Sequence, residues 1–190
     1  MPEIICNTSP LQYLHQLGLL DVLKALVGQI IVPPAAVAEL AEGRGQGVDV
    51  PDLDRLDWVT VRSPLSTAAV PLVTNLGSGE TQVLMLALES SDAVVVLDDA
   101  LARQLAEALN LRLTGTLGIL LDAKRAGLLP TVAPHLDRLQ LLRFRLASHT
   151  RAAVLKRQES DLRTVRFPDR RLACIVWGVS APVPVRRHAR

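Results

Sequence analysis

Acidic and amide side chains follow the apolar segments of this chain at places where a buried carboxylate would need a cationic partner. Glu80 stands at the beginning of a strongly apolar stretch, and Asp98 and Asp99 follow the uninterrupted apolar run at 93–97. Asn7 follows another short apolar run near the beginning of the chain. A divalent metal ion is one partner that could offset the cost of burying such groups, so the pattern indicates a candidate metal site.

Each of these residues also has an ordinary structural interpretation. Glu80 would be stabilised by the helix N-terminus that it begins, an effect of about 0.3–1 kcal/mol. Asp98 would cap a helix, Asn7 would form a turn, and Glu39 would be a surface residue of a helix. The chemical interpretation rests on the set, because three carboxylates and one amide supply only oxygen ligands, the donors that Mg²⁺ and Mn²⁺ prefer.

Other kinds of catalytic site find little support in the sequence. The four histidines are scattered and form no zinc-binding cluster with the two cysteines, and there is no nucleophile elbow or Walker lysine. The adjacent aspartates suggest a receiver-like or haloacid-dehalogenase-like protein as one alternative. That alternative requires an Asp-x-Asp motif or a phosphoacceptor aspartate with a downstream lysine, and the sequence offers no convincing set.

Short apolar segments alternate with helical patterns, which predicts an α/β fold with a mostly parallel sheet and helices on both faces. The predicted strands are 3–6, 29–32, 57–61 as an edge strand, 93–97 and 111–113. The first predicted helix begins at Ser9 as the N-cap and has leucines 11, 14, 17 and 20 on one face, and the second begins at Pro33. Further helices are predicted at 80–89, 101–109, 117–126, 132–146 and 150–159, and loops at 43–47 and 62–76. Ligands of such sheets bind at the carboxyl ends of the strands, where Asn7, the Asp98–Asp99 pair and Thr114–Thr116 would gather.

The charge of the chain is unevenly distributed, although its 190 residues carry a net charge of only +2. Residues 1–122 hold 15 acidic and 6 basic residues, a net −9, whereas residues 123–190 hold 4 acidic and 15 basic residues, a net +11. The acidic part could hold cations and the basic part could hold phosphate backbones. Periodicity fails from about residue 160, so we predict a domain at 1–158 and a basic, poorly ordered tail at 159–190.

The composition favours a cytoplasmic protein without a membrane anchor. We find no signal peptide, and the longest uncharged apolar stretch, 172–185, is shorter than the roughly 20 residues of a membrane span. The two cysteines indicate no disulfide framework. Aromatic residues make up 3% of the chain, so any binding of nucleic acid would depend on charge rather than on base stacking.

Five short motifs, in order, resemble PIN-domain proteins, and in particular a PIN-like branch related to VapC-type toxin ribonucleases. The resemblance covers about residues 3–158, and five motifs in register are more specific than any one of them. The motifs are Ile5-Cys6-Asn7-Thr8-Ser9-Pro10-Leu11, Ile31-Val32-Pro33-Pro34-Ala35 leading to Glu39, Gly77-Ser78-Gly79-Glu80-Thr81, Val96-Leu97-Asp98-Asp99-Ala100-Leu101-Ala102-Arg103, and Thr114-Gly115-Thr116-Leu117-Gly118.

The resemblance implies a PIN-like, Rossmann-like three-layer sandwich and a metal-dependent endoribonuclease, the toxin of a type II toxin–antitoxin pair. RNA would be its substrate, a cognate antitoxin its protein partner, and a homodimer its expected assembly. Bound Mg²⁺ or Mn²⁺ would lower the pKa of a water molecule and stabilise charge on the phosphate. By position in the motifs, the expected catalytic residues are Asn7, Glu39, Glu80 and Asp98, of which Asn7, Glu80 and Asp98 would bind the metal, with Asp99, Thr114 and Thr116 in support.

Asn7 departs from the usual pattern of the family, in which the first acid is an aspartate. An asparagine still offers a carbonyl oxygen, but it removes one negative charge, so we expect weaker metal binding. This departure keeps a second hypothesis open, a non-catalytic PIN-like module that binds RNA or a protein partner. Three arginines, Arg103, Arg143 and Arg145, are candidates for steering an RNA backbone.

Overall fold

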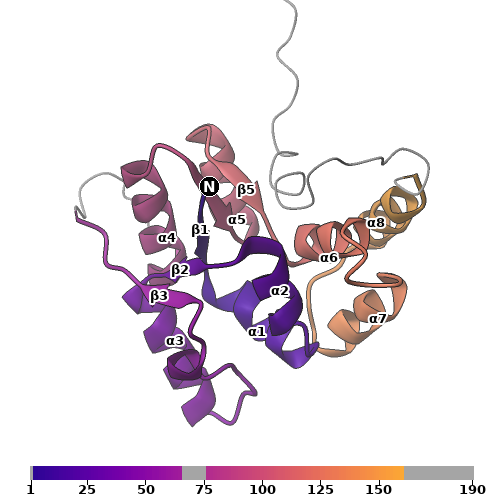
Figure 1. Ribbon diagram of the computed structural model, residues 1–190, viewed down its shortest axis with the longest axis horizontal. Coiled ribbons are helices and arrows are strands. Elements are labelled where there is room, and N and C mark those ends of the chain that lie inside the picture. Colours follow the sequence, from indigo (N-terminus) through magenta and orange to yellow (C-terminus); the bar gives the residue numbers. More distant parts are fainter. Residues whose placement is uncertain (1, 66–75, 161–190) are drawn as a thin grey trace, which may run out of the picture.

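The computed structural model describes residues 2–65 and 76–160 of the chain. These residues form five strands in one fully parallel sheet with the order β3-β2-β1-β4-β5 (Figure 1). The strands are β1 (Glu3–Cys6), β2 (Ile30–Val32), β3 (Val59–Val61), β4 (Ala93–Val96) and β5 (Arg112–Thr114). The predicted parallel α/β fold is therefore confirmed, with β3 at an edge as expected.

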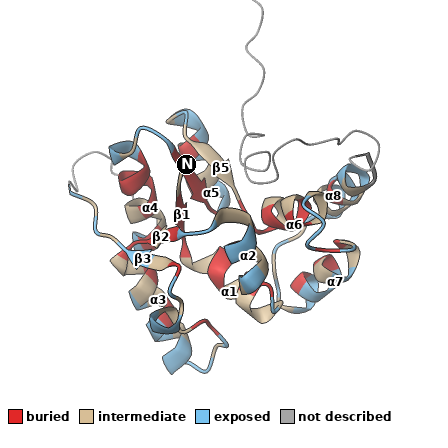
Figure 2. Ribbon diagram, in the orientation of Figure 1, coloured by how far each residue is buried: buried red, intermediate tan, exposed pale blue. Residues whose placement is uncertain are grey.

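Helices cover both faces of the sheet, because its inner strands carry apolar side chains on both faces and each face must be shielded from water. They are α1 (Thr8–Gln16), α2 (Leu20–Val27), α3 (Pro34–Gly45), α4 (Ser78–Glu89), α5 (Ala100–Ala108), α6 (Thr116–Arg125), α7 (Ala133–Leu141) and α8 (Ser148–Ser160), with a short 3-10 turn at Leu53–Arg55. Figure 2 shows that burial is concentrated on the central strands and on the helix faces turned toward them.

Alternate residues of the two central strands enter two separate apolar cores. Ile4 and Cys6 of β1 pack in one core with residues of α1, α2, α3, α6, α7 and α8. Ile5, together with Val95 of β4, packs in the other core with residues of α4 and α5. This two-residue period follows from the pleat of a strand, and it produces the three-layer sandwich.

The prediction of one helix running from Ser9 to Leu20 is wrong. Helix α1 ends at Gln16, Gly18 adopts a φ of +71°, and α2 begins at Leu20. The N–H groups at 17–19 donate back to carbonyls at 13–15, which satisfies the end of α1 before the chain turns. The leucine period continues across this break because both helices pack on the same core. The predicted N-cap is wrong as well, since Asn7 rather than Ser9 occupies that position.

The predicted helix 132–146 is also too long. Helix α7 ends at Leu141, Arg143 has a φ of +63°, and the N–H of Phe144 donates to the carbonyl of Leu139. The chain turns there because the Phe144 ring packs edge-on against Tyr13 of α1, with 4.9 Å between ring centroids. Helix α3 also differs from the prediction, because it continues to Gly45, three residues into the predicted loop at 43–47.

The domain boundary that we predict at residue 158 stays a prediction. Helix α8 continues to Ser160, two residues into the tail predicted at 159–190, and the rest of that tail lies outside the described residues, as does most of the predicted loop at 62–76. Within the described ranges, no helix combines the length and the apolar character that a bilayer span requires.

Candidate active site

The predicted site residues lie at the carboxyl edge of the sheet. Strands β1 and β4 are neighbours, with Cys6 beside Val96, so Asn7 and Asp98 both emerge at the same edge just after the pairing ends. The Asn7 N–H donates to the carbonyl of Val96 at 3.2 Å and continues the strand contact by one residue. Glu39 comes from the middle of α3 and Glu80 from the first turn of α4, two helices that pack against each other.

Asn7 is buried and contacts Glu80 directly. Its Nδ2 donates a hydrogen bond to Glu80 Oε1 at 2.9 Å, and the residue as a whole is only 2% exposed. Asn7 stands at the N-cap position of α1, yet its side chain makes no capping bond with that helix. Asn7 therefore occupies the N-cap position without capping the helix through its side chain, because its amide is directed toward α4.

Glu39 is a half-buried hydrogen-bond acceptor rather than a plain surface residue. Its Oε2 accepts from Thr8 Oγ1 at 2.6 Å, and its Oε1 accepts from Ser78 Oγ at 3.1 Å and from the Gly79 N–H at 2.9 Å. The carboxylate of Glu39 thus satisfies an unpaired N–H group at the beginning of α4 and joins that helix to α1.

Glycine at position 79 leaves room for these oxygens to converge. A Cβ atom at Gly79 would lie 2.5 Å from Asn7 Oδ1 and 2.8 and 2.9 Å from the two carboxylate oxygens of Glu39. A Cβ atom at Gly77 would collide with Glu80 Oε2 in the same way. The Gly-Ser-Gly-Glu motif is therefore explained by the close approach of side-chain oxygens, and strained backbone dihedrals play no part in it.

Asp98 and Asp99 have different roles at the end of β4. Both Asp98 oxygens accept from Thr116, Oδ1 from its N–H at 2.9 Å and Oδ2 from its Oγ1 at 2.5 Å. The helix cap that one interpretation gave to Asp98 belongs to Asp99, whose Oδ1 accepts from the Ala102 N–H at 2.9 Å. Of the two predicted supporting threonines, Thr116 contacts Asp98 through its side chain, whereas Thr114 contributes a backbone carbonyl to the same region.

Arg103 holds the ends of β4 and β5 together. Its Nη1 donates to the carbonyl of Leu97 at 2.9 Å and to the carbonyl of Thr114 at 3.2 Å. Arg103 is half-buried, and its charge lowers the pKa of the Asp98 carboxyl against the larger opposite effect of burial. We therefore assign Arg103 to positioning Asp98 and not to contacting RNA.

The electrostatics separate the predicted acids into two parts. Burial raises the pKa of the Glu80 carboxyl above its ordinary value, and the charges of Glu39 and Asp99 raise it further, against the hydrogen bond from Asn7. Burial likewise raises the pKa of Asp98, and the hydrogen bonds from Thr116 oppose that rise. The structure thus brings Asn7, Glu39 and Glu80 together with Asp99 within electrostatic range. Asp98 emerges at the same edge of the sheet, but its side chain makes its own separate contacts with Thr116.

The donor chemistry of this edge fits a hard divalent cation. Oxygen atoms of Asn7 and Glu39 converge above Gly79, and the Glu80 carboxyl lies next to them. Among the described residues, no three His, Cys, Asp or Glu side chains are grouped closely enough to hold a metal ion by themselves. Any metal site here would consequently need the amide oxygen of Asn7 as well as the acids.

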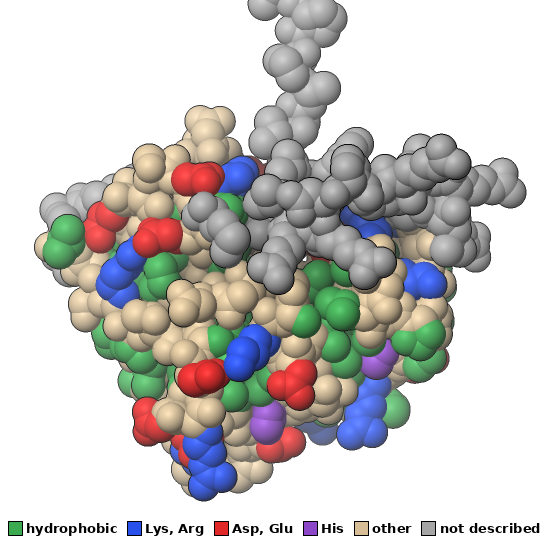
Figure 3. Space-filling view, viewed as in Figure 1, with side chains coloured by type: hydrophobic (Ala, Val, Ile, Leu, Met, Phe, Trp, Pro, Cys, Tyr) green, Lys and Arg blue, Asp and Glu red, His purple; other side chains and the backbone are tan. Residues whose placement is uncertain are grey.

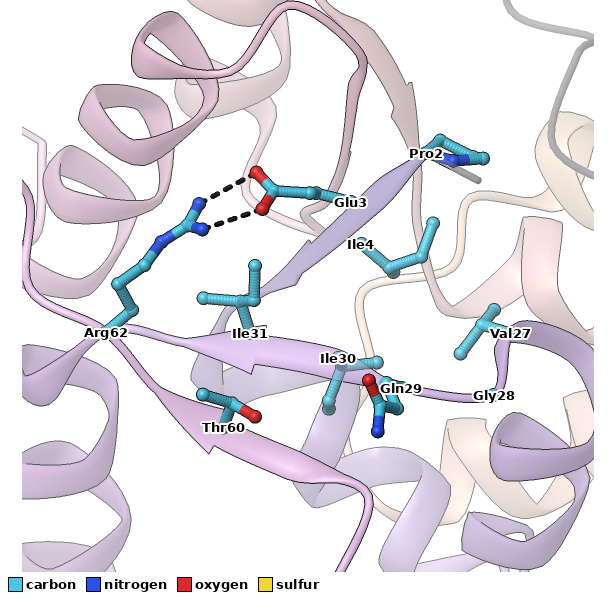
Figure 4. Close-up of a pocket in the computed structure, with 10 residues that line it drawn as sticks. All are labelled: Pro2, Glu3, Ile4, Val27, Gly28, Gln29, Ile30, Ile31, Thr60 and Arg62. Carbon is cyan, nitrogen blue, oxygen red and sulfur yellow. Dashed lines mark hydrogen bonds and ion pairs between the residues drawn. The ribbon is translucent and has the colours of Figure 1, made fainter.

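Two pockets lie at the opposite, amino edge of the sheet and do not include these residues. One has a volume of about 420 Å³ and the other about 520 Å³, and both border the ion pair between Glu3 and Arg62 (Figure 4). The paired bonds of 2.7 and 2.9 Å lower the pKa of Glu3 to about 2. Sequence reasoning did not find this pair, because the two residues are 59 positions apart and neither stands in a recognisable motif.

A parallel α/β sandwich with acids gathered at the carboxyl edge of its sheet defines the class to which this protein belongs. A family model described as a PIN domain matches residues 3–160, and the chain therefore belongs to the PIN-domain family. PIN domains are commonly nucleases that use divalent metal ions. Comparison with curated proteins and with solved structures gives no match.

Proposed function

We propose that this protein is a metal-dependent endoribonuclease that hydrolyses RNA phosphodiester bonds, and that it is the toxin of a type II toxin–antitoxin pair. The observation that carries the proposal is the convergence of Asn7 and Glu39 oxygen atoms above Gly79, with the Glu80 carboxyl bonded to Asn7 beside them, in a chain of the PIN-domain family. The cytoplasm would be its place of action, and a small antitoxin protein would be its partner.

The residues at this edge of the sheet would have separate roles in binding the metal and in positioning its ligands. Asn7, Glu80 and Asp98 would hold Mg²⁺ or Mn²⁺, which when bound supplies an activated water and stabilises charge on the phosphate. Glu39 would fix the beginning of α4 through its bonds to Ser78 and Gly79, and so the position of Glu80. Thr116 and Arg103 would orient Asp98, and the Asp99 charge would add to the attraction for a cation.

A specific contact favours the second candidate, a PIN-like module that binds RNA or a protein without cleaving. The Asn7 amide donates to Glu80, so the chain itself supplies a partner for a carboxylate that would otherwise require a cation. Such a site is stable without metal, and its affinity for metal is reduced by the missing charge.

A cleavage assay with a panel of RNAs and added Mn²⁺ or Mg²⁺ tests the two candidates. We expect the wild-type chain to cleave, Asp98→Ala to lose cleavage, and Glu107→Gln to keep it, since Glu107 is an exposed residue of α5 away from the site contacts. Absence of cleavage by folded wild-type protein with every metal tried would reject the enzyme and leave the binding module.

The toxin role is tested by induced expression in a bacterial host. Wild-type expression should stop growth, and Asp98→Ala should not. Co-expression of a short neighbouring reading frame for a DNA-binding protein should restore growth. Normal growth with active nuclease present would reject the toxin role alone, and the predicted homodimer is measured separately by sedimentation.

A further inference from the structure

The connector between α7 and α8 packs against α1 through a ring contact. It lies next to the carboxyl edge of the sheet that carries Asn7 and Asp98, called the acidic edge below. Phe144 packs edge-on against Tyr13, with ring planes at 83° and centroids 4.9 Å apart. Tyr13 belongs to α1, the helix that begins directly after Asn7. The turn at Arg143, with its φ of +63°, is what brings Phe144 to this position. Arg145, the next residue along, is therefore held near the site by packing that does not involve its own side chain.

Electrostatics agree with this placement of Arg145. Burial raises the pKa of the Tyr13 hydroxyl, the charge of Asp98 raises it further, and the charge of Arg145 lowers it. The pKa of this one hydroxyl thus depends both on the Asp98 carboxylate at the end of β4 and on the Arg145 guanidinium in the connector. Tyr13 accordingly lies within electrostatic range of both Asp98 and Arg145.

The guanidinium of Arg145 is available to a ligand. Arg145 is exposed and has no ion pair or hydrogen bond with the described residues. By contrast, Arg151 pairs with Asp137 at 2.7 Å and Arg125 pairs with Asp122 at 3.0 Å. The Tyr13 hydroxyl likewise has no hydrogen-bond partner within the part of the chain that the structure describes.

The surroundings of Arg145 carry an excess of positive charge. Residues 123–160 contain 8 basic and 2 acidic residues, a net +6. Figure 3 shows mostly basic side chains at the α7 and α8 end of the face in view, whereas acidic side chains are frequent over the rest of that face. These basic residues would therefore attract a polyanion such as RNA toward the α7–α8 side of the acidic edge.

We propose that Arg145 binds a backbone phosphate of a single-stranded RNA whose neighbouring phosphodiester lies at the acidic edge, with the Tyr13 hydroxyl as a second donor to that phosphate. This inference rests on the proposed function and names how the same site takes hold of its substrate. A single RNA strand is sufficient as the ligand, because the proposed contact is to one backbone phosphate and requires no base pairing. The acidic edge itself would repel phosphates without such a neighbour.

The experiment measures binding of a fluorescent single-stranded RNA to the full chain in EDTA, where metal-dependent cleavage is prevented. Each phosphate contact to a single strand contributes about −0.7 to the slope of log K against log[salt]. We expect Arg145→Ala to make that slope less negative by about 0.7, and Arg145→Lys to keep most of it. Arg138→Ala is the matched control, because Arg138 is an exposed arginine of α7 without a described partner.

The outcomes separate this inference from the proposed function. An equal change of slope in the Arg145→Ala and Arg138→Ala variants overturns the inference, and so does a wild-type chain that binds no RNA. Loss of antitoxin binding in Arg145→Ala with an unchanged RNA slope overturns it in favour of a protein interface. A selective change of slope in a protein that never cleaves RNA supports the inference while the nuclease proposal fails.

Discussion

Replacing Asn7 by aspartate would introduce the acid that the resemblance to PIN domains led us to expect at this position, and would test what the amide does here. Asn7 Nδ2 donates to Glu80 Oε1 at 2.9 Å, and its Oδ1 faces the carboxylate of Glu39 across Gly79. In Asn7→Asp the N–H donor disappears, and a carboxylate oxygen takes its place against Glu80. Three carboxylates would then share one buried corner.

The cost in the absence of metal is large by the standards of a single substitution. A hydrogen bond to a charged group contributes about 1.5–3 kcal/mol, and two unit charges about 4 Å apart repel by about 4 kcal/mol at an effective dielectric constant of 20. Protonating one carboxyl avoids the repulsion, and holding that proton at pH 7 costs up to about 4 kcal/mol. We therefore expect Asn7→Asp to lower the free energy of unfolding by about 3 kcal/mol at neutral pH.

The pH dependence of this loss has a definite sign. The pKa of the carboxyl pair would be raised in the folded state, so the loss is complete above that raised pKa and disappears below the ordinary value of about 4. Urea unfolding in EDTA at pH 5 and pH 7.5 measures it. Gln104→Glu is the control, because it makes the same change of amide to carboxylate at an exposed position within α5.

Added Mn²⁺ should then reverse the loss. A third carboxylate raises metal affinity, and a ligand stabilises the folded state by RT ln(1 + [L]/Kd). The melting temperature of Asn7→Asp should consequently rise with Mn²⁺ by more than that of the wild type. Equal stability of the two proteins in EDTA at pH 7.5, or a loss that is the same at pH 5, would refute the reasoning.

Three further predictions follow from the same contacts. Glu80→Gln keeps the acceptor for Asn7 but removes a carboxyl group whose pKa is raised by burial, so the stability of the metal-free protein should rise above pH 5. The increase in melting temperature on adding Mg²⁺ or Mn²⁺ should become smaller, and an unchanged increase would count against Glu80 as a ligand. Thr116→Val removes the 2.5 Å bond to Asp98 and should cost about 1.5–3 kcal/mol in urea unfolding, and a cost near zero would contradict the contact. Deleting residues 161–190 should leave a cooperative thermal transition, because the family match ends at residue 160; loss of soluble folded protein would contradict the domain boundary.

The fold was predictable where the sequence pattern and the tertiary requirement agree. The run at 93–97 is apolar at every position, which is typical of a strand buried on both faces, and β4 is an inner strand of the sheet, between β1 and β5. The break at Gly18 was missed because the leucine period on either side is continuous. The end of α7 was missed because the contact of Phe144 with Tyr13 joins residues far apart in the chain.

The location of the site was predictable, but its bonds were not. Parallel strands end at one edge, so polar residues after different strands had to meet there. Asp98 and Asp99 are indistinguishable by composition, yet neighbouring residues at a strand end point to opposite faces, and only Asp98 can reach Thr116. The position of Glu39 depends on how α3 packs against α4, which no local pattern encodes.

The Asn7 amide connects the stability of the site with its affinity for metal. A corner of three carboxylates must take up a metal ion or a proton before it can fold well. With asparagine, the amide N–H donates to Glu80, while Thr8 and the N–H of Gly79 donate to Glu39, so the corner is satisfied by the chain alone. The same group then competes with a cation for Glu80, and each gain in metal-free stability is a loss in metal binding. A nuclease built on this corner would therefore need a higher free metal concentration for half-maximal activity than one with aspartate at position 7.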